Sequence, residues 1–164
     1  MRTAILTISS SLASGEGEGE DLSGPALADA ATAAGCDVEL REVLADDQAA
    51  IESRLRELVA EGFDVILTSG GTGLTPDDVT PEASEAVIER PVPGIAEALR
   101  AASMQFTPAA AISRATSGVA GGTLIVNMPG NPKAIGEAFP VLAPILGHAV
   151  RHIGREGGRT DGEH

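Results

Sequence analysis

Residues 63–73 are Phe-Asp-Val-Ile-Leu-Thr-Ser-Gly-Gly-Thr-Gly, a short apolar run that leads directly into a glycine-rich loop. Phe63–Leu67 has the length and the aliphatic composition of a strand that is buried on both faces. Glycines in the loop permit positive φ angles and close approach of a ligand, and consecutive N–H groups can cradle a phosphate. In open α/β sheets, ligands bind beyond the carboxyl ends of strands, where this loop lies.

The glycine spacing alone leaves two interpretations of this loop open. It lacks the Gly-Lys-Ser/Thr ending of a P-loop, and Pro76 stands where a dinucleotide fingerprint has its third glycine. A tight turn after the strand accounts for the glycines equally well. The other interpretation is a nucleotide-phosphate loop formed by Ser69, Gly70, Gly71, Thr72 and Gly73.

Strand-like and helix-like segments alternate on both sides of residues 63–73. We expect further strands at 3–8 and 38–43, a loop at 9–20, and a hairpin of 112–119 and 123–128. The expected helices are 23–34 capped by Ser23, one that Asp46 or Asp47 opens, one capped by Thr80, 95–104, and a long stretch around 135–149 that Pro140 and Pro144 should break or kink.

This alternation predicts an α/β fold with three layers: a mostly parallel sheet, helices on both faces and an antiparallel edge hairpin. The length of 164 residues suits one domain, which we place at residues 1–153, with a flexible tail at 154–164.

Composition excludes several classes of function. Acidic residues outnumber basic ones 24 to 11, and the net charge of −13 argues against nucleic acid or an anionic membrane as partner. The lone Cys36 excludes an intramolecular disulfide. No run approaches 18 apolar residues and the N-terminal segment lacks a cleavage pattern, so we expect a cytoplasmic protein. A phosphorylated small molecule is compatible with this net charge if hydrogen-bond donors or a metal ion at its site offset the negative potential of the protein.

Four segments, 9–14, 45–48, 69–78 and 129–132, follow predicted strands, so parallel strands would bring their candidate ligand-binding residues to one edge. Asp46 and Asp78 can hold Mg²⁺ against a triphosphate, or they can cap a helix and stabilise a turn. Asn131-Pro132-Lys133 suits an anion site at a helix start, or a helix start alone. Ser113 and Arg114 offer a hydroxyl and a phosphate-binding fork, although Arg114 can pair with a carboxylate instead.

The sequence resembles a known family. Residues 68–83, Thr-Ser-Gly-Gly-Thr-Gly-Leu-Thr-Pro-Asp-Asp-Val-Thr-Pro-Glu-Ala, are similar to the signature of the molybdopterin-binding family of molybdenum-cofactor biosynthesis, which includes molybdopterin adenylyltransferases and the gephyrin G domain. Supporting matches are Asp21–Pro25, Pro93-Gly94, Ile112–Ala115 and Met128–Pro132.

The resemblance implies a nucleotidyltransferase that joins AMP from Mg²⁺-ATP to molybdopterin and releases pyrophosphate, in molybdenum or tungsten cofactor assembly. It implies that Asp46 and Asp78 are the essential acids, and that Ser113, Arg114, Pro129, Gly130 and Asn131 face the pterin or its phosphate. It also implies a homotrimer or hexamer, and a downstream metal-insertion protein as a candidate partner.

Two departures from the family pattern keep an alternative open. Asp77 stands where the family usually has Arg, and Ser9-Ser10-Ser11 stands where the first loop commonly carries an Asp. Extra negative charge beside a triphosphate site would weaken ATP binding. The alternative is a non-catalytic molybdopterin-binding or carrier protein of the same pathway.

Overall fold

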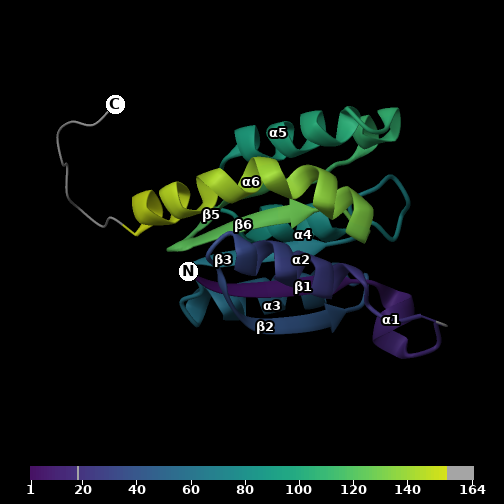
Figure 1. Ribbon diagram of the computed structural model, residues 1–164. Coiled ribbons are helices and arrows are strands. Elements are labelled where there is room, and N and C mark those ends of the chain that lie inside the picture. Colours follow the sequence, from purple (N-terminus) through teal and green to yellow (C-terminus); the bar gives the residue numbers. More distant parts are fainter. Residues whose placement is uncertain (18, 155–164) are drawn as a thin grey trace.

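The computed structural model describes residues 1–17 and 19–154 of the chain. Within these residues six strands form one sheet in the order β2-β1-β3-β6-β5-β4 (Figure 1). Strands β2, β1, β3 and β6 are parallel, and β5 and β4 extend the sheet antiparallel to their neighbours. The predicted α/β fold is therefore confirmed. The strands are β1 (Arg2–Ile8), β2 (Asp37–Leu44), β3 (Val65–Ser69), β4 (Arg90–Pro91), β5 (Ser117–Ala120) and β6 (Thr123–Met128).

Helices cover both faces of the sheet. On one face lie α2 (Ser23–Ala33), α5 (Pro93–Met104) and α6 (Pro132–Ile153), and on the other lie α3 (Gln48–Ala60) and α4 (Thr80–Val87) (Figure 1). Alternate residues of one strand serve the two layers, since Ile5 packs with the first group and Leu6 with the second. With only three Phe in the chain, both layers are built mainly from Leu, Ile, Val and Ala.

The edge hairpin is confirmed, but its first strand is shorter than expected. Residues 117–120 pair with β6, whereas Pro108–Ile112 form a 3₁₀ helix, η1, that Thr107 caps by accepting a hydrogen bond from the Ala109 N–H. Proline at the first helical position favours that turn over a strand. The prediction of strand for 112–116 was therefore wrong, and the two-residue strand β4 was not predicted.

Helix α6 is continuous, so the predicted break at Pro140 and Pro144 was wrong. Each proline removes the hydrogen bond to the carbonyl four residues earlier. Those carbonyls belong to Gly136 and Pro140, which are both exposed. Water can therefore replace the missing N–H donors, and the buried side of the helix keeps its packing.

Three smaller predictions also need correction. Part of the expected 9–20 loop is the short helix α1 (Ser10–Ser14), which the Ser9 side chain caps. Ser23 and Thr80 are not caps, because each lies inside its helix and the N-cap residues make no side-chain cap. At α2 the Asp21 carboxylate accepts the Gly24 N–H instead, at 2.8 Å.

Among the described residues, no helix combines the length and apolar character needed to cross a membrane. Gly154 ends α6, and the rest of the predicted tail, residues 155–164, lies outside the described residues.

Candidate functional site

The carboxyl ends of four parallel strands meet at one edge of the sheet. The register places Ile8 beside Leu44, Thr7 beside Ser69, and Ser69 beside Met128. The segments that follow these strands therefore start at the same level, as the alternating sequence predicted. This is where α/β sheets bind ligands.

The glycines of the loop after β3 are sterically required. Gly70 and Gly71 have φ angles of 99° and 64°, which favour glycine. A Cβ atom on Gly70 would lie 2.5 Å from the carbonyl oxygen of Ile8, and one on Gly71 would overlap the Thr80 hydroxyl. The loop therefore packs tightly against the end of β1 at position 70 and against the start of α4 at position 71. Only glycine leaves enough room at these two positions.

Hydrogen bonds fix this loop on three sides. The Ser69 hydroxyl donates to the Pro129 carbonyl at 2.8 Å, which ties the loop to the end of β6. The Thr80 N–H donates to the Gly71 carbonyl at 3.1 Å, and the Arg114 N–H donates to the Thr72 carbonyl at 2.9 Å. The loop backbone is therefore held in place by its own chain.

Asp46 reaches this loop from the end of β2. Its Oδ2 atom accepts hydrogen bonds from the Ser10 N–H at 2.8 Å and the Ser10 hydroxyl at 2.9 Å. Its Oδ1 atom lies 3.3 Å from the position a Cβ atom would take on Gly71. The cap of α3 is Asp47, whose side chain accepts the Ala50 N–H, so Asp46 is not the capping residue. One carboxylate oxygen of Asp46 thus faces the glycine loop.

Asp78 closes the far end of the same loop. Its Oδ2 atom accepts hydrogen bonds from the Thr75 N–H at 2.9 Å and the Thr75 hydroxyl at 2.7 Å, and it lies 2.8 Å from a Cβ position on Gly73. Burial acts to raise the pKa of this carboxyl. Donation from Thr75 and the Gly73 N–H, together with the Arg114 charge, outweighs burial and leaves the pKa below its ordinary value. The carboxyl therefore both stabilises a turn and stays ionised.

Arg114 stabilises the second half of the loop, residues 73–78, through hydrogen bonds. Its Nε donates to the Gly73 carbonyl and its Nη2 donates to the Asp78 carbonyl, each at 2.7 Å, while Nη1 donates to Glu82. The hydrogen bond from Arg114 lowers the pKa of the Glu82 carboxyl, and the same bond raises the pKa of the Arg114 guanidinium. In this arrangement the guanidinium contacts protein groups.

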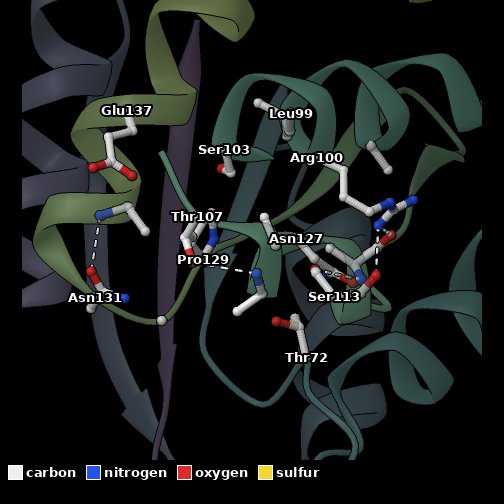
Figure 2. A pocket seen from close by; sticks show the side chains of 16 residues that line it. Thr72, Leu99, Arg100, Ser103, Thr107, Ser113, Asn127, Pro129, Asn131 and Glu137 are labelled. Atoms are coloured by element: carbon white, nitrogen blue, oxygen red, sulfur yellow. Dashed lines mark hydrogen bonds between the residues drawn. The ribbon is translucent and has the colours of Figure 1, made fainter. Parts of the chain in front are cut away.

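A cavity of about 240 Å³ lies beside the loop, between α5, η1 and the start of α6. Figure 2 shows Arg100 and Ser113 on one side, Asn131 and Glu137 on the other, and Thr72 at the loop. Arg100 is held by the carbonyls of Ser113 and Ala115 through its Nη1. The rest of the wall is largely small and apolar, so the cavity suits an organic group with polar substituents.

The structure brings part of the predicted site into this cavity. Of the predicted residues, those that line it are Thr72, Ser113, Pro129, Gly130 and Asn131. The other predicted residues lie along the loop and do not line the cavity: Ser69, Gly70, Gly71, Gly73, Arg114, Asp46 and Asp78. Asn131 also caps α6 by accepting the Ala134 N–H at 2.9 Å, which confirms that helix start.

Sequence reasoning missed several residues at this edge. Asn127 is a polar residue directly after the apolar run Leu124–Val126, and that interruption was a usable signal. It donates hydrogen bonds to Thr68 and Ser84 and accepts one from the Thr116 N–H while lining the cavity. Glu137 carried no such signal, because an acid on a helix is ordinarily exposed.

Comparisons with known proteins identify the family and agree with the fold. A family model described as "Probable molybdopterin binding domain" matches residues 4–148. The molybdopterin adenylyltransferase of Escherichia coli is 37% identical over 156 residues, which cover 93% of this chain and 78% of that protein. The molybdopterin biosynthesis enzyme MoaB of Thermus thermophilus superposes with a TM-score of 0.86 at 40% identity, covering 93% of this chain and 95% of that one.

Other relatives are longer. The chain covers 19% of the molybdenum cofactor synthesis protein cinnamon of Drosophila melanogaster, at 42% identity over 113 residues. It covers 49% of a molybdenum cofactor biosynthesis bifunctional protein of Chlorobaculum tepidum. The chain thus spans less than two thirds of some curated relatives it matches.

Proposed function

This chain belongs to the molybdopterin-binding family of molybdenum-cofactor biosynthesis proteins, and we propose that it transfers AMP from ATP to the phosphate of molybdopterin. The observation that carries the proposal is one rigid glycine loop with a carboxylate at each end, Asp46 against Gly71 and Asp78 against Gly73. The names of relatives in E. coli and Helicobacter pylori support the same activity.

The reaction is a nucleotidyl transfer. An oxygen of the pterin phosphate attacks the α-phosphorus of ATP, a new phosphorus–oxygen bond forms, and the bond from that phosphorus to the bridging oxygen of the β-phosphate breaks. The electron pair of the broken bond leaves with pyrophosphate. Such transfers need mainly positioning and charge neutralisation. In our proposal the N–H groups of residues 70–73 hold the nucleotide phosphates.

The acids at this loop fit a divalent ion that arrives with its nucleotide. Mg²⁺ is usually bound through one or two carboxylates plus substrate phosphates and retains several waters. Among the described residues, no group of three or more acidic, histidine or cysteine side chains is placed to hold a metal without such help. In the part of the chain that the structure describes, no residue donates a hydrogen bond to Oδ1 of Asp46, so this atom is available as a ligand. When bound, the ion would neutralise phosphate charge, and Asp46 and Asp78 would hold it.

The cavity is the proposed pterin site. Ser113, Pro129, Gly130 and Asn131 line it, and Arg100 and Glu137 place opposite charges on facing walls. Molybdopterin carries ring donors and acceptors on one edge and a phosphate on its side chain, so it needs both kinds of partner. The proposed pterin site adjoins the proposed nucleotide loop through Thr72, which belongs to both.

The test is a direct assay of AMP transfer with purified protein, molybdopterin, ATP and Mg²⁺. Asp78→Asn should abolish formation of the AMP–pterin product and leave the unfolding temperature near that of the wild type. The amide oxygen can still accept both Thr75 hydrogen bonds, whereas the negative charge is lost. Wild-type turnover in this variant would remove Asp78 from the mechanism.

Asp77→Asn is the matched control. Asp77 is the exposed neighbour of Asp78, and removing its charge should keep or raise activity because it stands beside a polyanion site. A carrier protein would form no AMP–pterin product in this assay, and in calorimetric titration it would bind molybdopterin but show no Mg²⁺-dependent affinity for ATP. The adenylyltransferase names of the relatives favour the enzyme.

We also propose a cytoplasmic homotrimer or hexamer. Met104, Phe106 and Ile112 cluster in sequence around the end of α5 and η1 and are all largely exposed, which supports a contact between copies there. Light scattering after gel filtration measures the assembly, and a monomer at micromolar concentration would contradict it.

A further inference from the structure

Two histidines face one another near the end of α6, away from the glycine loop. His148 and His152 are both exposed and lie one helical turn apart, so they share one face of the helix. Their ring centroids are 4.1 Å apart and the ring planes are tilted by 31°. Such a pair can present two imidazole nitrogens to one ion with small side-chain adjustments.

The hydrogen bonding of His152 prepares it as a ligand. Its Nδ1 lies 2.9 Å from the carbonyl oxygen of His148. A carbonyl oxygen can only accept, so in the neutral imidazole Nδ1 carries the hydrogen and Nε2 keeps its lone pair. Metal-binding histidines typically donate their second ring nitrogen to a backbone carbonyl or carboxylate in this way, which fixes the tautomer and the ring orientation.

The electrostatic surroundings also favour a cation. The carboxyl end of a helix carries partial negative charge, and the chain as a whole has a net charge of −13. Arg151 is the cationic side chain beside the pair, and its Nη1 lies 3.4 Å from a Cβ position on Gly147, one turn back along the helix. The guanidinium thus extends along a neighbouring strip of α6 toward Gly147.

We propose that His148 and His152 form a surface site for a divalent transition-metal ion such as Cu²⁺, Ni²⁺ or Zn²⁺, with water completing the coordination. Imidazole ligands suit these ions, whereas Mg²⁺ prefers oxygen. The site is separate from the proposed active site, since Glu137 is the last cavity residue on α6 and about 16 Å of helix lies between it and His148. A bound ion links two successive turns and so stabilises the end of α6.

Calorimetric titration of the metal-free full chain with Zn²⁺, Ni²⁺ and Cu²⁺, in the presence of excess Mg²⁺, tests this site. We expect a single site whose affinity is highest for Cu²⁺, as the Irving–Williams order requires. His148→Asn and His152→Asn should each weaken binding by roughly tenfold or more, because changes even in groups that support a metal ligand commonly cost that much. The double variant should not bind.

His164→Asn is the control, because it changes the third histidine of the chain and should leave binding intact. Imidazole NMR signals give an independent readout, with two of three histidines responding to Zn²⁺. Three results would overturn the site: no binding by the wild type, undiminished binding by the double variant, or loss of binding in His164→Asn. The second result would assign the ion to surface carboxylates.

Discussion

Replacing Gly70 by alanine tests how closely the glycine loop approaches β1. The φ angle of 99° is unfavourable for any residue with a Cβ atom, at about 1–2 kcal/mol. The new Cβ would lie 2.5 Å from the Ile8 carbonyl oxygen, 0.9 Å inside the 3.4 Å at which ordinary contacts begin. The Ile8 carbonyl belongs to a paired strand, so overpacking there should cost a further 1–3 kcal/mol, roughly.

Together these effects predict a loss of about 2–5 kcal/mol in the free energy of unfolding. For a chain of 164 residues this lowers the unfolding temperature by about 5–15 °C. Full relief of the clash moves the loop by about 0.9 Å relative to β1. If the loop holds the nucleotide, AMP transfer should fall by on the order of 10²-fold, because misplacement of about 1 Å can cost that much.

Gly136→Ala is the matched control, measured by calorimetry and by the same transfer assay. Gly136 lies inside α6 with no atom within 4 Å of its Cβ position, so alanine should stabilise the helix by about 0.5–1 kcal/mol. If Gly70→Ala were as stable and as active as the wild type, the close approach to β1 and its part in catalysis would both be refuted.

Two further substitutions test the surroundings of the loop. Glu82→Gln removes the ion pair with Arg114, and because folding lowers the pKa of Glu82, its stabilisation is present above the ordinary carboxyl pKa and is lost as the pH falls. Denaturant titrations should therefore give the variant a lower free energy of unfolding than the wild type at neutral pH, and this difference should shrink below about pH 4. A difference that stays constant with pH would contradict the linkage. Asn127→Ala leaves the buried Thr68 and Ser84 hydroxyls and the part-buried Thr116 N–H without their amide partner, and should cost about 1–3 kcal/mol in urea unfolding. An unchanged midpoint would show that water replaces the amide.

The sequence predicted the strands well because their signal is local. Runs such as Thr3–Ile8 and Phe63–Leu67 are predominantly apolar, and a strand covered on both faces accommodates them at that length. The parallel direction of these strands followed from their alternation with helices, whereas their order in the sheet was not predicted. The convergence of the loops at one edge was then a geometric consequence.

Features that depend on distant partners escaped prediction. Pattern alone could not choose between Asp46 and Asp47 as the cap of α3, and the choice follows from Ser10, which binds Asp46 from another loop. The predicted break of α6 at Pro140 and Pro144 was wrong, because the effect of a proline depends on whether the helix carbonyl that loses its N–H partner faces water. For Arg114 the sequence left two alternatives open, a phosphate fork or a pair with a carboxylate, and the contacts with Glu82 and two loop carbonyls agree with the second.

The two borders of the sheet limit how copies of this molecule can associate. At one border β4 has only two residues, one of them Pro91, which lacks an N–H to offer an incoming strand. At the other, Asp37, Glu39 and Arg41 alternate as exposed charged residues along β2, and such charges discourage edge-to-edge pairing. Neither edge of the sheet therefore favours fibre growth by strand addition. Association between copies is directed instead to helices and loops, through which a closed oligomer can form.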